Sequence, residues 1–344
     1  MPDPPRASGA PPAVPPGQSR SKLRSWLELL RVPNLLTVPG DPLAGFVVAK
    51  AAGDVGADLT APEAVSLALA ATVSLLLYAA GLLWNDWFDL AEDRRERPQR
   101  PLPSGRVRPA SAAVAAGALM AAALVFAYFA GRSVLVVAGI LAAAILAYNA
   151  LLKRNGVLGP ATMGLCRGLS VLVGAAALPG GPLLVTAALV LAGGAVLYIA
   201  AVTALAAGET RATDVKGKAA FIAVAASSWL LGLVLAVQEG SPESRWARTA
   251  AAAFTMIYVG FCLAKLGGKR HEPGKAGEDG KGAPPAEPPE PALVQKTIGR
   301  LLRGAILFQV TAVVSTSWSG AALAGGLLVC FGLNAVLVKR FYAS

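Results

Sequence analysis

The stretch NDWFDLAEDRRERPQRPLPSG, residues 85–105, is the most informative part of this chain. It follows directly on the apolar run SLALAATVSLLLYAAGLLW, residues 66–84. An apolar run of about twenty residues is long enough to cross the hydrocarbon core of a bilayer as a helix. The charged side chains of residues 85–105 are therefore expected where a membrane-spanning helix meets water. Carboxylates gathered there need a physical reason, because they repel one another unless a cation neutralises them.

Similar apolar runs recur along the whole chain of 344 residues, of which 55% are hydrophobic. This pattern predicts an all-α protein, a polytopic transmembrane helical bundle with nine to ten spans. The first run contains Pro39 and Pro42, which predict a kink in its helix. The expected spans are about 33–52, 63–85, 109–130, 133–152, 157–178, 182–206, 218–237, 247–266, 298–316 and 318–338.

The net charge of +11 comes largely from basic residues in alternate loops between the apolar runs. Such loops face the cytoplasm, so the charge pattern favours an even number of spans with both termini inside. We therefore expect an integral protein of a bacterial-type cytoplasmic (inner) membrane that binds no nucleic acid. The single histidine, His271, lies in a polar loop, and the three cysteines have no metal-ligand spacing. These facts argue against a His-metal or Ser-His-Asp site.

Polar low-complexity segments divide the chain. Residues 1–22 are expected to be a disordered cytoplasmic tail, and residues 268–293 a disordered cytoplasmic linker, because neither can bury enough apolar surface to fold. The membrane domain then consists of residues 23–267 and residues 294–344. The stretch VQKTIGRLLRG, residues 294–304, is amphipathic and is expected to lie on the membrane surface.

The acidic stretch has a regular spacing. If it forms one helix and Asn85 is set at zero, Asp89, Asp93 and Asp86 lie at about 40°, 80° and 100° around the axis. The four side chains then share one arc at the cytoplasmic end of the second span. Clustered carboxylate oxygens suit Mg²⁺, which commonly bridges to substrate phosphates. The arginines that follow, Arg97 and Arg100 among them, can pair with phosphate oxygens. A solvated, mixed-charge helix end would have a similar composition.

The motif NDxxDxxxD followed by RPxRPLPSG resembles the first acidic motif of the UbiA superfamily of intramembrane prenyltransferases. Three further stretches resemble that superfamily: Arg31 to Asn34, Tyr148 to Arg154, and GLCRGLSVLVG at residues 164–174. The resemblance covers roughly residues 24–340. It implies a helical bundle around a central cavity that opens to lipid. It also implies Mg²⁺-dependent transfer of an isoprenyl group from its diphosphate to an acceptor that is often an aromatic ring.

A second acidic motif of the superfamily, commonly DxxxDxxxD, is incomplete here. Residues 208–220 read GETRATDVKGKAA, in which Glu209 and Asp214 are the only acids. Their interval of five places them about 140° apart on an ideal helix, so the two acids do not readily share one metal. Lys216 and Lys218 follow and can contact a diphosphate directly. An ordinary basic cytoplasmic loop would also have this composition.

The leading hypothesis is a UbiA-type prenyltransferase whose active site faces the cytoplasm, with Mg²⁺, an isoprenyl diphosphate and an aromatic or lipid acceptor as partners. The incomplete second motif keeps two alternatives open: a UbiA-type terpene cyclase, and a non-enzymatic membrane binder or transporter of a prenylated or aromatic metabolite. The residues expected to act in catalysis and to hold the metal are Asp86, Asp89, Asp93 and Asp214, with Glu209 as a further metal ligand.

The expected substrate-binding residues carry hydrogen-bond donors and lie near the expected span ends or within spans. They are Asn34, Asn85, Arg97, Arg100, Tyr148, Lys153, Arg154, Arg167, Lys216 and Lys218. Several of them also suit a purely structural role. Lys153 and Arg154 fit as positive-inside anchors, Arg167 as a side chain that snorkels to the interface, and Asn34 as a bond to a neighbouring helix.

Overall fold

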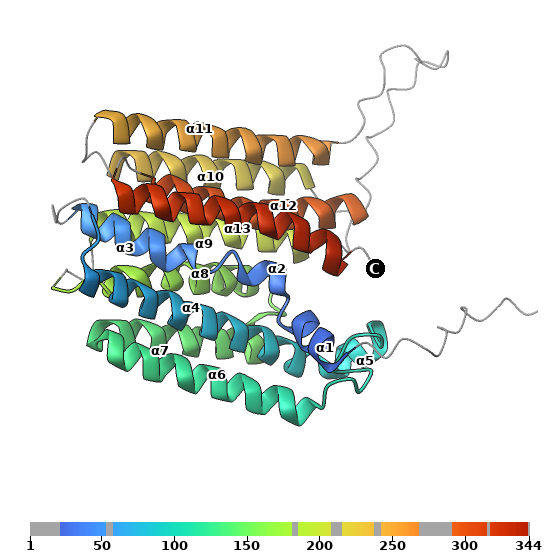
Figure 1. The fold of residues 1–344 in the computed structure, drawn as a ribbon. Coiled ribbons are helices and arrows are strands. Elements are labelled where there is room, and N and C mark those ends of the chain that lie inside the picture. The colour runs from blue at the N-terminus through green and yellow to red at the C-terminus, as the bar shows by residue number, and fades with distance from the viewer. Residues whose placement is uncertain are drawn as a thin grey trace, which may run out of the picture.

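The computed structural model describes residues 21–52, 58–180, 185–207, 215–236, 242–267, 291–314 and 317–342. In these residues the secondary structure is helical and no strand occurs, as the sequence predicts. The long helices lie side by side in one bundle (Figure 1). They are α3 (Gly40–Ala52), α4 (Ala61–Phe88), α6 (Pro109–Ala130), α7 (Arg132–Ala147), α8 (Leu158–Ala176), α9 (Thr186–Ala207), α10 (Val215–Ala236), α11 (Pro242–Ala264), α12 (Pro291–Val313) and α13 (Trp318–Tyr342).

Shorter elements connect these helices. They are α1 (Lys22–Leu29), α2 (Val32–Leu35), α5 (Leu90–Glu96), a π-helical turn (Tyr148–Leu152) and a 3₁₀ turn (Lys265–Gly267). The described part of the chain starts and ends at one end of the bundle, because α1 and α5 lie at the same end as the end of α13 (Figure 1). This arrangement agrees with the even number of crossings expected from the charges.

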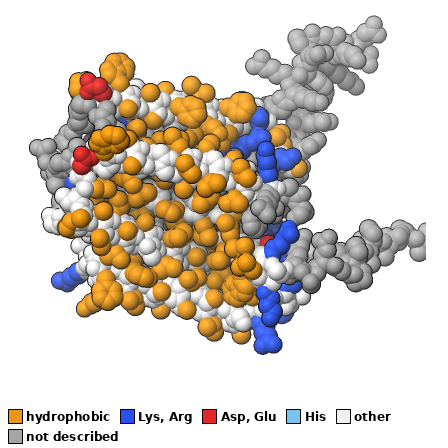
Figure 2. Space-filling model, viewed as in Figure 1, with side chains coloured by type: hydrophobic (Ala, Val, Ile, Leu, Met, Phe, Trp, Pro, Cys, Tyr) orange, Lys and Arg blue, Asp and Glu red, His pale blue; other side chains and the backbone are white. Residues whose placement is uncertain are grey.

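Nine segments of the described chain are long and apolar enough to cross a membrane. Helix α12 is not among them, since it carries Lys296, Arg300 and Arg303, yet it packs against α3, α9, α11 and α13. Hydrophobic side chains cover the face of the bundle, and Lys and Arg side chains gather at the end that holds α1 and α5 (Figure 2). The predicted all-α transmembrane bundle of nine to ten spans is therefore confirmed.

The first span is interrupted where its prolines predict a kink. Helix α2 ends at Leu35, and α3 begins at Gly40. Side chains donate hydrogen bonds to the backbone carbonyls at this break. The Thr37 hydroxyl donates to the Asn34 carbonyl at 2.8 Å, and the Thr37 carbonyl accepts from Gln309 at 2.8 Å and Arg167 at 2.9 Å. The broken helix is thus held by groups from α8 and α12.

The amphipathic stretch at residues 294–304 is not a separate surface helix. It forms the first half of α12, which continues without a break to Val313. Thr297 and Leu301 of this stretch are fully buried. Further along α12, the ring of Phe308 stacks on Trp229 of α10 with centroids 4.1 Å apart. The expectation of a surface position was wrong because the apolar face of this helix is covered by neighbouring helices.

Helices α3 and α8 cross in backbone contact, which two glycines make possible. A Cβ on Gly174 of α8 would lie 1.9 Å from the Pro42 carbonyl oxygen, and a Cβ on Gly45 of α3 would lie 1.9 Å from that of Val171. The close approach keeps the broken first span against α8. Small residues at such crossings are typical of helices that pack inside membranes.

Replacing Gly174 by Ala should push α3 away from α8. We expect the free energy of unfolding to fall by about 1–3 kcal/mol, as for other over-packed sites. The control is Gly139→Ala on α7, where an added Cβ meets nothing within 4 Å. Unfolding of both purified variants in mixed micelles measures the difference. Equal stability of the two variants would contradict the close crossing.

Candidate functional site

The acidic stretch occupies the end of α4, the short helix α5 and the loop that leads to α6. Helix α4 ends at Phe88 and α5 begins at Leu90, so Asp89 is the junction residue. The acidic residues therefore do not lie on one continuous helix. The prediction from their spacing assumed one helix, and the structure differs from it in this respect. The three carboxylates come instead from the end of α4, the junction residue and α5.

Each of the three carboxylates pairs with a different cation. Asp86 accepts from Arg31 at 2.8 Å, and Asp93 accepts from Arg100 at 2.8 and 3.1 Å. Lys153 forms an ion pair with Asp89. The Asp86 and Asp93 side chains are only 8% and 5% exposed, so their charges need these partners.

Arg100 connects two members of the cluster. Its Nη1 atom lies 2.8 Å from Asp93 and 3.9 Å from Asp86. Arg97, at the end of α5, lies 4.0 Å from Asp93 but is 54% exposed. The Asn85 amide lies 3.5 Å from Asp86, at the limit of a hydrogen bond. The structure thus brings together most of the residues predicted from the acidic stretch.

Arg31 reaches Asp86 from an unusual backbone conformation. Its φ of 44° and ψ of 56° are left-handed, and no other described non-glycine residue has a positive φ. This conformation is uncommon for a side chain without Asn or Asp character and is often found at functional sites. The turn between α1 and α2 therefore holds the guanidinium of Arg31 against the end of α4.

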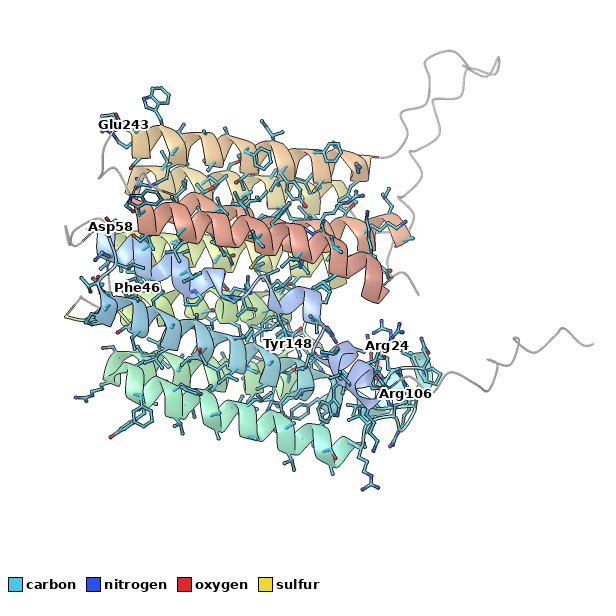
Figure 3. The ribbon with its side chains drawn as sticks, in the orientation of Figure 1. Arg24, Phe46, Asp58, Arg106, Tyr148 and Glu243 are labelled. Carbon is cyan, nitrogen blue, oxygen red and sulfur yellow. The ribbon has the colours of Figure 1, made fainter. Side chains whose placement is uncertain are left out.

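The partner of Asp89 comes from the turn after α7. Residues Tyr148–Leu152 form a π-helical turn, an insertion that is frequent at functional sites, and Lys153 follows it directly. Arg154 lies 3.6 Å from Glu92, but both side chains are largely exposed. Tyr148 lies toward the end of the bundle that carries Arg24 and Arg106, and away from Asp58 and Glu243 at the opposite end (Figure 3). Lys153 therefore contacts the acidic cluster through Asp89, and Tyr148 begins the turn that leads to it.

The donor chemistry of this cluster fits Mg²⁺, which prefers carboxylate oxygens. Asp86 and Asp93 already share the charge of Arg100, so both lie within reach of one cation. In the described part of the chain, however, no three acidic, histidine or cysteine side chains are grouped closely enough to hold a metal ion. The carboxylates are paired with Arg31, Lys153 and Arg100 instead.

A second polar cluster lies inside the bundle. Asp41 pairs with Arg167 at 3.1 Å and accepts a hydrogen bond from Gln309 at 2.7 Å. All three side chains are buried. Because Arg167 is buried and paired, it does not snorkel to the interface. Its partners are Asp41 and the Thr37 carbonyl, so the structure does not bring it to the acidic cluster.

The remaining predicted residues are spread more widely. Asn34 lies in α2 with a half-buried side chain. Lys218 donates to the carbonyl of Ala204 near the end of α9 at 3.0 Å. Glu209 and Asp214 lie outside the described residues, as does the side chain of Lys216.

Spacing along the sequence does not single out three polar residues that the structure places at key contacts. Arg31 enters the prediction only through the stretch from Arg31 to Asn34, although it is the partner of Asp86. Gln309 and Asn334 interrupt otherwise apolar helices and are buried. The sequence signal for these two residues is an amide side chain within an apolar run, because buried polar groups nearly always have hydrogen-bond partners.

The model of the UbiA prenyltransferase family matches residues 43–269 of this chain. The chain belongs to the UbiA prenyltransferase family. This membership, with the nine apolar helices of the described residues, makes it an integral membrane protein. The family match includes the acidic cluster but leaves out α2, α12 and α13.

Curated relatives of this UbiA family member are digeranylgeranylglyceryl phosphate synthases. The one from Natronomonas pharaonis is 33% identical over 159 residues, which are 46% of this chain and 54% of the relative. The one from Methanopyrus kandleri is 32% identical over 154 residues, 45% of this chain and 53% of the relative. The chain thus spans about half the length of the curated relatives it matches. Their names give no support to the aromatic acceptor that the sequence led us to expect.

Solved structures share the fold of this UbiA family member. A UbiA homolog from Archaeoglobus fulgidus bound to DMAPP and Mg²⁺ has a TM-score of 0.56 at 15% identity, and covers 90% of this chain and 99% of that chain. A structure of digeranylgeranylglyceryl phosphate synthase has a TM-score of 0.55 at 19% identity, with 92% and 99% coverage. At these identities the likeness supports the fold alone.

The buried pair of Asp41 and Arg167 generates a stability prediction. Asp41→Leu should lower the free energy of unfolding by about 3–5 kcal/mol, because it leaves a buried guanidinium unpaired. The double variant Asp41→Leu/Arg167→Leu should recover much of this loss, since no charge then remains. Unfolding in mixed micelles measures both. A single variant as stable as the wild type would show that the pair does not hold the broken helix.

Proposed function

We propose that this protein is an Mg²⁺-dependent intramembrane prenyltransferase that takes its isoprenyl group from a diphosphate. The observation that carries the proposal is the set of three ion pairs at the end of α4. Asp86, Asp89 and Asp93 are paired with Arg31, Lys153 and Arg100 respectively. Three carboxylates and three cations thus alternate at one end of an apolar bundle, a composition suited to both a metal and a diphosphate.

The proposed roles follow from the charges. Asp86, Asp89 and Asp93 would hold Mg²⁺, with Asn85 beside Asp86. Mg²⁺ bound there would stabilise the negative charge of the diphosphate leaving group. Arg31, Arg100 and Lys153 would then exchange their carboxylate partners for phosphate oxygens, which accept charge-assisted hydrogen bonds of similar strength. No cation of the cluster would be left buried without a partner during this exchange.

The surroundings of the cluster suit the rest of the substrate. Apolar side chains of α1, α4 and the loop before α6 pack together beside it, among them Leu29, Leu83 and Leu102. An apolar wall next to the diphosphate would accommodate the prenyl chain and exclude water from an allylic cation. The lateral opening to lipid implied by the family would let both substrates enter from the membrane.

The acceptor is proposed from the relatives. The product for which they are named, digeranylgeranylglyceryl phosphate, contains two prenyl chains on a glyceryl phosphate. A transferase that adds the second chain needs geranylgeranylglyceryl phosphate as acceptor. We therefore propose a prenylated glyceryl phosphate in place of the aromatic acceptor expected from the sequence.

The same proposal includes orientation. The described Lys and Arg side chains are concentrated at the end of the bundle that carries α1 and α5 (Figure 2). By the positive-inside rule this end faces the cytoplasm, so the acidic cluster would open on the cytoplasmic side of the cytoplasmic membrane. The segments 1–22 and 268–293 are proposed as cytoplasmic tail and linker on the same basis.

Asp89→Asn tests the metal role. The variant should lose Mg²⁺-dependent binding of geranylgeranyl diphosphate by about a hundredfold, because a metal ligand contributes several kcal/mol. The matched control is Glu92→Gln, which removes an acid from the same stretch whose side chain is 46% exposed and pairs with Arg154. Equilibrium binding to the purified protein in detergent, with and without Mg²⁺, gives both values.

Two results would contradict the proposed function. One is Mg²⁺-dependent diphosphate binding that Asp89→Asn leaves intact. The other is wild-type protein that binds the diphosphate equally well without Mg²⁺. In either case the three ion pairs would stabilise the helix end and would not bind the metal and the diphosphate.

A further inference from the structure

Arg303 is a charged residue in the middle of a helix. It is residue 13 of the 23 in α12, so by the helical rise it lies about 18 Å from the start and 15 Å from the end. Its side chain is half-buried, and α12 packs against helices on several sides. An arginine at such a position is costly in a membrane protein and usually has a function.

The guanidinium of Arg303 is oriented by two neighbours on α13. Its Nε donates to the Asn334 side-chain oxygen at 2.8 Å, and the group lies 6.0 Å from the centre of the Phe331 ring. Asn334 is 3% exposed and donates to the Pro33 carbonyl at 2.5 Å, which fixes its own orientation. Within the described residues, the two terminal amino groups of Arg303 have no protein acceptor.

No acidic side chain near Arg303 balances its charge within the described residues. Across the described parts of α9 to α13 the sole acid is Glu243. Glu243 lies at the opposite end of the bundle (Figure 3). Arg300 is half-buried, lies one turn from Arg303 at about 60° around the helix, and forms no ion pair with a described residue. Two arginines thus face a region whose described residues lack carboxylates.

This region is close to the acidic cluster and separate from it. Helix α2 packs against both α4 and α13. From α2, the Pro33 carbonyl bonds to Asn334, while Arg31, two residues earlier, pairs with Asp86. Asn334 and Asp86 therefore flank the same short segment. Arg303 is thus connected to the acidic cluster through Asn334 and the segment of α2.

We propose that Arg303, oriented by Asn334 and supported by Arg300, binds the phosphate of the acceptor substrate. The inference rests on the proposed function, since it needs an acceptor that carries a phosphate. The terminal amino groups of an oriented guanidinium match two oxygens of a phosphate. A site without carboxylates binds such an anion directly, whereas the acidic cluster needs a metal to attract the donor diphosphate.

The test compares two acceptor probes that differ only in the phosphate, geranylgeranylglyceryl phosphate and geranylgeranylglycerol. Binding of each is measured with the full-length protein in detergent. The wild type should bind the phosphate probe about ten- to a hundredfold more tightly than the alcohol, as expected for charge-assisted hydrogen bonds. Arg303→Gln should abolish this preference without changing the affinity for the alcohol.

Three further variants separate the proposed role from a general effect of charge or folding. Lys296→Gln removes an exposed cation from the same helix and should keep the preference. Arg303→Lys keeps the charge without the planar fork and should retain only part of the preference. Arg300→Gln gives a second measurement that does not depend on how well the Arg303 variants fold, and should reduce the preference severalfold.

Competition identifies the source of the phosphate. The bound phosphate probe is challenged with unlabelled geranylgeranylglyceryl phosphate, inorganic phosphate or phosphatidylglycerol at the same concentration. Displacement by the first compound alone supports an acceptor site. Equal displacement by phosphatidylglycerol would overturn the proposal in favour of a general headgroup site. A phosphate preference that is absent from the wild type, or that survives in both Arg303→Gln and Arg300→Gln, would also overturn it.

The donor provides a separate control. Mg²⁺-dependent binding of geranylgeranyl diphosphate should be the same in Arg303→Gln as in the wild type. Absence of that binding in the wild type itself would be a failure of the proposed function. The phosphate preference is measured without Mg²⁺ or donor, so the two failures are distinguishable.

Discussion

Three carboxylates at the end of one membrane helix need three positive charges, and three separate segments of the chain supply them. Asp86, Asp89 and Asp93 lie within eight residues of one another, and two of them are almost completely buried. Their partners come from three different parts of the chain: the turn before α2, the turn after α7, and the loop after α5. The ion pairs of Asp86 with Arg31 and of Asp89 with Lys153 join segments that are far apart in sequence.

The broken first span connects the acidic cluster to several other helices of the bundle. A continuous helix would satisfy its own carbonyls with backbone N–H groups, but the first span is interrupted between Leu35 and Gly40. Arg167, Gln309 and Asn334 donate to the carbonyls of Thr37 and Pro33, so α8, α12 and α13 all bind the break. Arg31, at the start of α2, then reaches Asp86. Helices outside the part of the chain matched by the family thus contribute to the position of a residue in the acidic cluster.

The sequence predicts the architecture well because the signals for it are local. Apolar runs of bilayer length predict the helices, the prolines predict the break, and the basic loops predict which ends lie together. The acidic cluster is predicted in composition for the same reason. Its pairing is not, because Asp89 stands between two helices and a fixed rotation per residue no longer applies. The partners of Arg167 and the roles of Gln309 and Asn334 depend on contacts between helices that are far apart in the sequence. Spacing along one helix carries no information about such contacts.

The proposed chemistry requires that the three ion pairs open to admit a metal and a diphosphate together. The most direct measurement is a structure of the protein with Mn²⁺ in place of Mg²⁺ and a non-hydrolysable thio-analogue of geranylgeranyl diphosphate, in which the metal is located by its anomalous scattering. The expected result is metal on the carboxylates of Asp86, Asp89 and Asp93, and phosphate oxygens on Arg31, Arg100 and Lys153. A metal bound elsewhere, with all three ion pairs intact, would contradict the proposed role of the cluster.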